Sequence, residues 1–361
     1  MKHHKIRAYL SVVACGLLTG LLAAPAVGRP LYSVAGSLEL PGDGGWDALA
    51  FEQASHRLFI AHGTRVEVVD TQRLKRIGEI PDTPGVHAIA LAADLGRGYV
   101  SAGAADTIVV FDLKTLARLQ EIKSTGANPD AIIYDGATRR VFAFNGRGRN
   151  ATIIDAVSNE VIGTIALDAR PEFARADGQG HVYVNLEDKN SLALLDSRTL
   201  TVLAVWPLSG CEGPTGLALN AAAKQLYAAC GNRVMAVMDA TSGRMLGTVP
   251  IGGGADGAEY DPGARLAFAS CGEGVLTAVA QQASGVPAVA QSLPTQQGAR
   301  TMTLDERSHR IYLATASFGA TPAPTAEHPH PRPAILPGTF RLLVVTSRRE
   351  KLTTIAEGKS P

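Results

Sequence analysis

The chain has 361 residues, of which 46% are hydrophobic and 19% are charged, and its formal net charge is +1. Such a composition is typical of a globular protein and excludes an intrinsically disordered chain. The near-neutral charge, without a basic run, gives no electrostatic basis for binding nucleic acid or anionic lipid. The 38 glycines against 5% aromatic residues favour many turns and thin packing layers, which repeated short strands provide.

Residues 1–26 have the pattern of a secretory signal peptide. Three basic residues, at positions 2, 5 and 7, precede an apolar run from Ala8 to Ala24, and small residues follow. The run is short for a membrane span of about 20 residues. Lipidation at Cys15 is a further alternative, but apolar residues follow Cys15 where a lipoprotein has a polar tether. We expect cleavage near Ala26, a periplasmic or secreted location and no membrane span afterwards.

A repeat of about 42 residues runs through the rest of the chain, and each unit has the pattern of four short strands. Second strands such as HRLFIAHG, RRVFAFNG and KQLYAACG are followed by an apolar third strand. Two sequence markers recur along the chain with nearly the same spacing, and such agreement is not explained by chance. The third strand closes with Asp in five units, and the residue that opens the first strand recurs in seven: Asp47, His87, Asp130, Glu172, Thr215, Asp256 and Arg300.

Seven such units predict an all-β fold, a seven-bladed β-propeller of four-stranded antiparallel blades, as one domain over residues 27–361. The closing aspartates are Asp70, Asp112, Asp155, Asp196 and Asp239. Each opens a turn, so a short carboxylate that bonds the backbone two residues on is the expected role.

The segments LYAACGN and FASCGEG, with IDA and VIGTI, resemble the YVTN/YncE-like repeat family over about residues 30–355. The resemblance implies a seven-bladed propeller and agrees with export. It implies little about activity, because the family is described mostly by its repeat.

Two segments compete to close the ring as the outer strand of the last blade. Residues 34–40 resemble the fourth strand at 161–167, and residues 351–355 offer the same edge from the other end of the chain. Either solution removes an exposed strand edge, and the sequence leaves both open.

Strand direction places first-strand starts and second-strand ends on one side of the disc, here called the upper face. Loops on a rigid frame commonly carry function. Three interpretations of this polar set are a wet channel lining, a small-ligand site and a catalytic site. Carboxylates and imidazoles also suit a metal, but no close His spacing supports one. The candidate ligand-binding residues are Trp46, Asp47, His62, His87, Asp130, Asn145, Arg147, Glu172, Asn185, Glu187, Glu212, Thr215, Asp256 and Arg300.

The last unit carries a proline-rich insertion at residues 317–338 between its second and third strands. Proline density predicts an extended, semi-rigid segment, which emerges on the upper face and is expected to cover the channel mouth. Within it, the segment 327–330 offers a glutamate and two histidines. Antiparallel pairing in the fifth unit also predicts a Cys211–Cys230 disulfide at the upper rim, with Cys271 left as a thiol.

No G-x-S-x-G elbow, nucleotide loop or C-x-x-C-H haem motif is present, and the sequence leaves any cofactor unknown. The leading hypothesis is therefore a non-catalytic, monomeric scaffold of the cell envelope, which holds a small molecule or an envelope protein on its upper face. The alternative is a metal-assisted hydrolase resembling propeller lactonases, in which a metal-bound hydroxide attacks a carbonyl. Its candidate ligands or bases are Glu172, Asp256, Asn185 and Asp130.

Overall fold

The computed structural model describes residue 1 and residues 31–282, 285–323, 325 and 331–348. The chain divides into two units, Met1–Pro30 and Leu31–Pro361. The signal-peptide prediction for residues 1–26 therefore concerns positions that, apart from Met1, lie outside the described residues. The account below is of the second unit.

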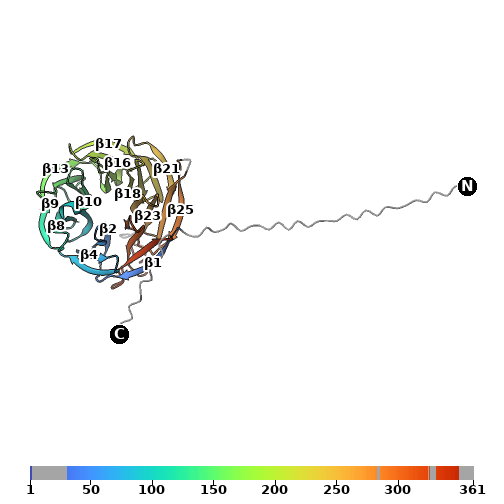
Figure 1. Ribbon diagram of the computed structural model, residues 1–361, viewed down its shortest axis with the longest axis horizontal. Helices are drawn as coiled ribbons and strands as arrows, with labels where there is room; N and C mark the ends of the chain where they lie inside the picture. Colours follow the sequence, from blue (N-terminus) through green and yellow to red (C-terminus); the bar gives the residue numbers. More distant parts are fainter. Residues whose placement is uncertain (2–30, 283–284, 324, 326–330, 349–361) are drawn as a thin grey trace, which may run out of the picture. The chain divides into compact units, whose positions relative to one another are not determined.

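The second unit is a seven-bladed β-propeller, and every blade is a four-stranded antiparallel sheet, as the sequence predicts (Figure 1). Six blades use four consecutive strands, ordered from the axis outward. These are blade 1, β2 (Trp46–Glu52), β3 (Arg57–His62), β4 (Arg65–Asp70) and β5 (Lys75–Ile80); blade 2, β6 (Val86–Ala92), β7 (Arg97–Ala102), β8 (Thr107–Asp112) and β9 (Arg118–Lys123); and blade 3, β10 (Pro129–Asp135), β11 (Arg140–Asn145), β12 (Asn150–Asp155) and β13 (Glu160–Ala166).

The next three blades repeat this arrangement. They are blade 4, β14 (Pro171–Ala176), β15 (His181–Leu186), β16 (Ser191–Asp196) and β17 (Thr201–Pro207); blade 5, β18 (Pro214–Asn220), β19 (Gln225–Cys230), β20 (Val234–Asp239) and β21 (Met245–Pro250); and blade 6, β22 (Ala255–Asp261), β23 (Leu266–Cys271), β24 (Val275–Gln281) and β25 (Pro287–Pro294). The helical elements of the described chain are two single turns, η1 (Ala93–Leu95) and η2 (Glu187–Lys189), and neither is long and apolar enough to cross a membrane.

Blade 7 closes the ring with strands from both ends of the unit. It consists of β26 (Met302–Asp305), β27 (Arg310–Thr315), β28 (Arg341–Ser347) and, outermost, β1 (Tyr32–Glu39). β1 pairs antiparallel with β28 from Tyr32 opposite Ser347 to Glu39 opposite Arg341. The N-terminal segment thus takes the outer-strand position, whereas the competing segment 351–355 lies outside the described residues.

The hydrophobic core is divided among the seams between neighbouring blades. Phe142 and Ile153 of blade 3, for example, pack with Val182 and Val184 of blade 4, and all four are fully buried. Six comparable clusters fill the other seams. Burying such a side chain contributes about 1.5–3 kcal/mol, so the seams supply the stability and leave the loops of both faces free for other roles.

The aspartates that close the third strands cap turns, as expected. Asp239 Oδ1 accepts hydrogen bonds from the Thr241 amide at 3.1 Å and from the Ser242 amide at 2.8 Å. The hydrogen bonds from Ser242 lower the pKa of Asp239. Equivalent amide bonds form in the other four turns. These carboxylates therefore have a structural role.

Candidate functional site: a central pocket on the upper face

One residue from each blade points into a pocket of about 790 Å³ at the centre of the upper face, here called the central pocket. The seven, here called the ring residues, are Asp47, His87, Asp130, Glu172, Thr215, Asp256 and Arg300. In blades 1 to 6 the ring residue is the second residue of the innermost strand. There the pairing with the second strand shifts register. A bulge of this kind re-aims a side chain, and the repeat thus directs polar groups toward the axis.

His87 connects two carboxylates from the neighbouring blades. Its Nδ1 lies 2.7 Å from Asp47 Oδ2 and 3.6 Å from Asp130 Oδ1. Burial alone would lower the pKa of His87, but the hydrogen bond with Asp47 and the negative charge of Asp130 raise it above its usual value. Burial raises the pKa of Asp130 to about 6. One donor atom from each of these three residues lies within 4.8 Å of the others, so the group can hold a metal ion.

Arg300 forms a bridge between blades 6 and 1. Its Nε lies 2.8 Å from Asp256 Oδ2, and its Nη2 donates to the Trp46 carbonyl at 2.9 Å. The guanidinium also stands 5.9 Å from the centre of the Trp46 ring, within cation–π range. Burial, together with the charge of Asp47, raises the pKa of Asp256 to about 7, although Arg300 opposes the shift.

Arg170 forms salt bridges with a second pair of carboxyl groups. Its Nη1 lies 2.8 Å from Glu187 Oε2, and its Nη2 lies 3.2 Å from Glu172 Oε1. Glu172 is only 8% exposed. Burial raises its pKa to about 9, and the negative charges of Asp130 and Glu187 add to the shift. Both glutamates and Arg170 line the central pocket.

An ion pair links the innermost strands of blades 4 and 6, β14 and β22. Arg175 and Glu259 each lie three residues further along their strands than Glu172 and Asp256. Arg175 Nη2 donates to the Ala258 carbonyl at 2.9 Å and pairs with Glu259 Oε1 at 2.9 Å, linking blade 4 to blade 6. This contact ties together two blades whose ring residues face the central pocket.

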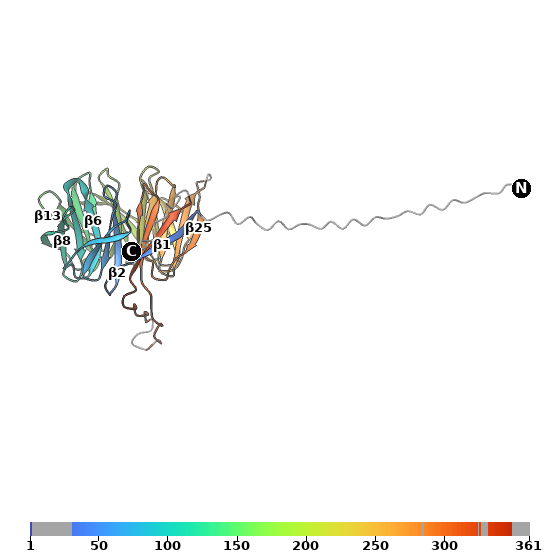
Figure 2. The ribbon, with the colours of Figure 1, turned by 60° about the horizontal axis from the view of Figure 1, so that its bottom comes forward.

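The described part of the insertion supplies one wall of the central pocket. Phe318 and Ile335 form an isolated antiparallel bridge, and the Gly319 amide donates to the Ala334 carbonyl at 2.9 Å. Phe318, Arg332, Pro333 and Ile335 all line the pocket. The insertion projects from one face of the disc (Figure 2). The Glu–His segment 327–330, which the sequence offered as further metal ligands, lies outside the described residues.

Nine of the fourteen candidate residues line the central pocket: Trp46, Asp47, His87, Asp130, Glu172, Glu187, Thr215, Asp256 and Arg300. Although Trp46 lines the pocket, it belongs mainly to the hydrophobic core. It is 4% exposed and packs on Phe340, with ring centres 5.7 Å apart.

Five candidates lie elsewhere, and two of them show why. His62 and Asn145 end their strands opposite Trp46 and Pro129, one residue before a ring residue. Strand alternation therefore turns their side chains away from the axis. His62 is fully buried and stacks on Phe340 with ring centres 3.9 Å apart. Asn145 is fully buried and bonded to Ser124 and Thr152.

The other three are also outside the pocket lining. Asn185 is fully buried, and its amide nitrogen donates to the Thr215 carbonyl at 2.9 Å and the Gly216 carbonyl at 3.1 Å. Arg147 and Glu212 are exposed on loops. Sequence reasoning missed Arg170 and Arg332, although the position of Arg170, two residues before Glu172, was a usable signal.

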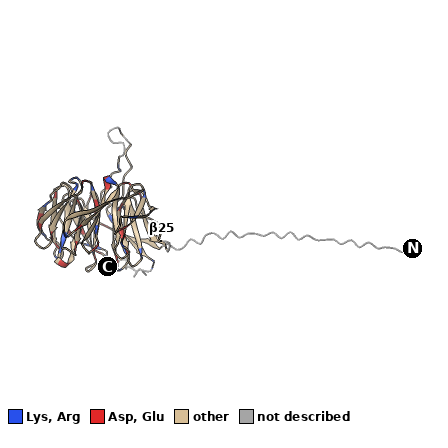
Figure 3. Cartoon of the chain, turned by 90° about the horizontal axis from the view of Figure 1, so that it is seen from above, with Lys and Arg blue, Asp and Glu red and all other residues tan. Residues whose placement is uncertain are grey.

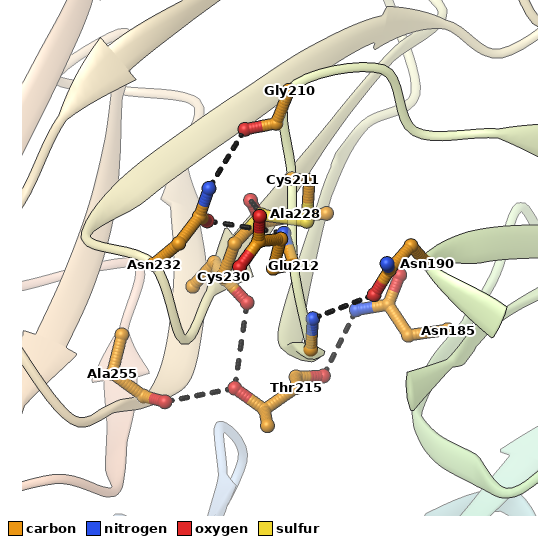
Figure 4. Close-up of a disulfide and its surroundings, with 12 residues drawn as sticks. Asn185, Asn190, Gly210, Cys211, Glu212, Thr215, Ala228, Cys230, Asn232 and Ala255 are labelled. Carbon is orange, nitrogen blue, oxygen red and sulfur yellow. Dashed lines mark hydrogen bonds between the residues drawn. A yellow bond between two sulfur atoms is a disulfide. The ribbon is translucent and has the colours of Figure 1, made fainter. Parts of the chain in front are cut away.

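The structure joins Cys211 to Cys230, with an S–S distance of 2.05 Å and Cα atoms 5.5 Å apart, and leaves Cys271 buried and unpaired (Figure 4). Asn232 Nδ2 donates to the Gly210 carbonyl at 3.0 Å beside the disulfide. These contacts fix the loop that leads into the innermost strand of blade 5, and so support the position of Thr215.

Two other cavities lie away from the central pocket. One of about 700 Å³ is lined by Tyr227, Tyr260, Arg265 and neighbouring residues, and one of about 180 Å³ is lined by Asp177, His181, Tyr183 and others. On the side of the second unit that Figure 3 shows, a few basic and acidic residues are scattered among uncharged ones. The central pocket differs from both cavities because all seven blades contribute to it.

Comparison with known proteins shows the fold and leaves the family open. No family model matches the sequence, and no curated protein matches it. Among solved structures, the WD40 repeats of RRP9 align with a TM-score of 0.71 at 10% identity, covering 88% of this chain and 99% of that one. A chain of a mitotic checkpoint complex aligns with a TM-score of 0.71 at 12% identity, covering 94% of this chain and 99% of that one. A chain of Kuenenia stuttgartiensis hydrazine synthase aligns with a TM-score of 0.67 at 15% identity, covering 76% of this chain and 94% of that one. At such identities the likeness establishes the propeller fold alone.

Proposed function

We propose that this protein is a YVTN/YncE-like ligand-binding propeller of the cell envelope, which holds a small polar molecule in the central pocket. The observation that carries the proposal is the convergence of all seven ring residues on one pocket, with the insertion as a further wall. A propeller needs apolar seams to fold, but it does not need charged groups at its axis. Buried charge costs stability unless it is compensated, so its retention here favours a functional role.

The charge of the pocket indicates what kind of ligand fits. Five carboxylates line it, from Asp47, Asp130, Glu172, Glu187 and Asp256, against three arginines. Burial raises the pKa of three of these carboxyl groups, to about 6, 7 and 9. Such shifts are common at functional sites. A ligand that brings positive charge to the acidic side would stabilise the ionised forms of these carboxyl groups, which burial disfavours.

The hydrolase alternative has weaker support from the geometry. Its four candidate groups do not form one set, because Asn185 lies outside the pocket lining. Asp256 and Glu172 are also engaged by Arg300 and Arg170. A binding role therefore explains the arrangement with fewer assumptions.

The test is a thermal-shift screen of amines, sugar acids, lactones and other small polar molecules, followed by calorimetric titration of the hits. A hit should bind wild type at least about tenfold more tightly than a variant that carries both Glu172→Gln and Asp256→Asn. The matched control is Asp177→Asn, which removes a carboxylate from the 180 Å³ cavity and should bind as wild type does. Equal affinity in the double variant, or a loss confined to the control, would refute the proposed site. Turnover of a lactone hit would favour the hydrolase.

Export has its own test. Expression of the full chain with N-terminal sequencing of the product should show a mature protein that begins just after residue 26, recovered from the periplasm or the medium. An uncleaved cytoplasmic product would contradict the envelope location.

A further inference from the structure

We infer that Asp47, His87 and Asp130 form a site for a divalent transition-metal ion on one side of the central pocket. The inference rests on the proposed function, because it names the chemical class of a ligand for that pocket. It differs from the metal set considered in the hydrolase hypothesis, since it shares only Asp130 with that set.

The geometry of the three donors is the first reason. They come from equivalent positions in three consecutive blades, and one donor atom from each lies within 4.8 Å of the others. His87 Nδ1 faces both carboxylates, at 2.7 Å from Asp47 Oδ2 and 3.6 Å from Asp130 Oδ1. An ion on Nδ1 takes the place of the proton that the imidazole now shares with Asp47, so binding releases that proton.

The charge distribution in the pocket is the second reason, and it is independent of the first. Arg300 is paired with Asp256, and Arg170 is paired with Glu172 and Glu187. Within the described part of the chain, the salt-bridge partner of both Asp47 and Asp130 is His87 alone. Two carboxylates on one imidazole leave a negative site that a dication neutralises, and its free coordination positions face a pocket of about 790 Å³.

The third reason is that hydrogen bonds and close contacts restrain the backbone and side chains around the three donors. Thr301 Oγ1 donates to the Asp47 carbonyl at 2.8 Å. The Ala88 amide donates to Ser101 Oγ at 2.9 Å, and Ser101 Oγ also donates to the Asp130 carbonyl. The His87 ring lies against Gly103, where an added Cβ would come within 2.7 Å of Cδ2 and 2.9 Å of Nε2. Donors supported in this way are preorganised for a ligand.

The donor types select the metal. One imidazole nitrogen and two carboxylate oxygens suit Mn²⁺, Fe²⁺, Co²⁺ or Zn²⁺, whereas Ca²⁺ prefers oxygen ligands alone. Two other His–Asp pairs have similar distances, but no third donor accompanies them among the residues that the structure describes. His181 Nδ1 lies 2.7 Å from Asp177 Oδ2, and His309 Nδ1 lies 2.8 Å from Asp261 Oδ2. They provide matched controls.

The experiment is calorimetric titration of Zn²⁺ and of Mn²⁺ into the tag-free full chain at pH 7.5, after removal of metals with a chelator. Wild type should bind one equivalent of at least one of these ions in a single event. Asp130→Asn and Asp47→Asn, which keep the side-chain shape, should each weaken that event at least about tenfold, in the range that altered ligand shells produce. His181→Leu should bind as wild type does. Circular dichroism confirms that each variant is folded.

A second control addresses the two histidines of the insertion, which lie outside the described residues. The double variant His328→Ala, His330→Ala should retain the event. Absence of binding for both ions, undiminished binding in Asp130→Asn and Asp47→Asn, or a loss in either histidine control would overturn the assignment. The outcome is separable from the proposed function. If polar ligands still depend on Glu172 and Asp256 while no metal binds, only the metal site fails; if metal binds but no ligand depends on those residues, only the proposed function fails.

Discussion

Replacing Glu172 by glutamine should stabilise the protein at neutral pH, because the folded state keeps this carboxyl group protonated. The side chain is 8% exposed and its pKa is raised from 4.5 to about 9. Burial is the main cause, and Asp130, Glu187 and Asp256 add negative charge around it while Arg170 opposes them. Glutamine has the same shape as the neutral acid and has no charge to bury.

The sign of the effect follows from proton binding. With a folded-state pKa above the unfolded value, the native protein holds a proton that the unfolded chain releases, so the free energy of unfolding falls as pH rises from 4.5 to about 9. Between pH 4.5 and pH 7 this loss of unfolding free energy amounts to about 3 kcal/mol, which is the part of the shift that lies below pH 7. Because Arg170 at 3.2 Å retains part of its attraction for the anion, we expect about 2 kcal/mol. For a domain of this size that is roughly a 3 °C rise in Tm.

The assay is urea or thermal unfolding of wild type and Glu172→Gln between pH 4.5 and 9, with a chelator present. Asp130 and Asp256 titrate in the same window in both proteins, so their contributions largely cancel and the difference between the two curves reports mainly on Glu172. It should be near zero at pH 4.5 and grow with pH. Glu187→Gln is the matched control, since Glu187 shares Arg170 but its side chain is 28% exposed. A difference that is flat with pH, or a variant less stable than wild type at pH 8, would refute the reasoning.

Three further predictions test other parts of the structure. The double variant Cys211→Ala, Cys230→Ala should lose about 3 kcal/mol of unfolding free energy, since the crosslink spans 19 residues; chemical denaturation measures this, and an unchanged midpoint would contradict it. Replacing residues 320–333 by Asn-Gly should change Tm by less than about 3 °C, because the Gly319–Ala334 contact is retained and loop length affects closure entropy only slowly; cooperative unfolding at a much lower temperature would show that the insertion is part of the core. Gly103→Ala should displace the His87 ring and weaken metal binding at least about tenfold with little change in secondary structure; normal affinity would mean that the ring position does not matter.

The repeat made the fold predictable, because each blade repeats the same alternation and the same turn chemistry. The ring residues followed from the same register, since a position that recurs once per blade must lie at one radius and one height. The markers at Asp47 and Asp256 therefore located the central pocket before any coordinates. Ring closure was not predictable, because the segments 34–40 and 351–355 have similar strand patterns.

The second-strand ends were the weaker part of the prediction. Assigning His62 and Asn145 to the upper face was reasonable from strand direction, but direction does not fix which side of a strand a residue occupies. The observed pairing opposite Trp46 and Pro129 turns both side chains into the seams. Arg170 was missed for a different reason: it precedes the strand in a loop, where strand periodicity does not apply, and only its position two residues before Glu172 marked it.

Crystallographic screening of the full chain with small polar fragments tests the central claim most directly. The three cavities offer competing sites in one experiment, since fragments are free to choose among them. The account predicts that bound fragments cluster in the central pocket and contact ring residues such as Asp130 and Arg300. Clustering in the cavity lined by Tyr227 and Tyr260, or in the one lined by Asp177 and His181, with the central pocket empty of fragments, would contradict it.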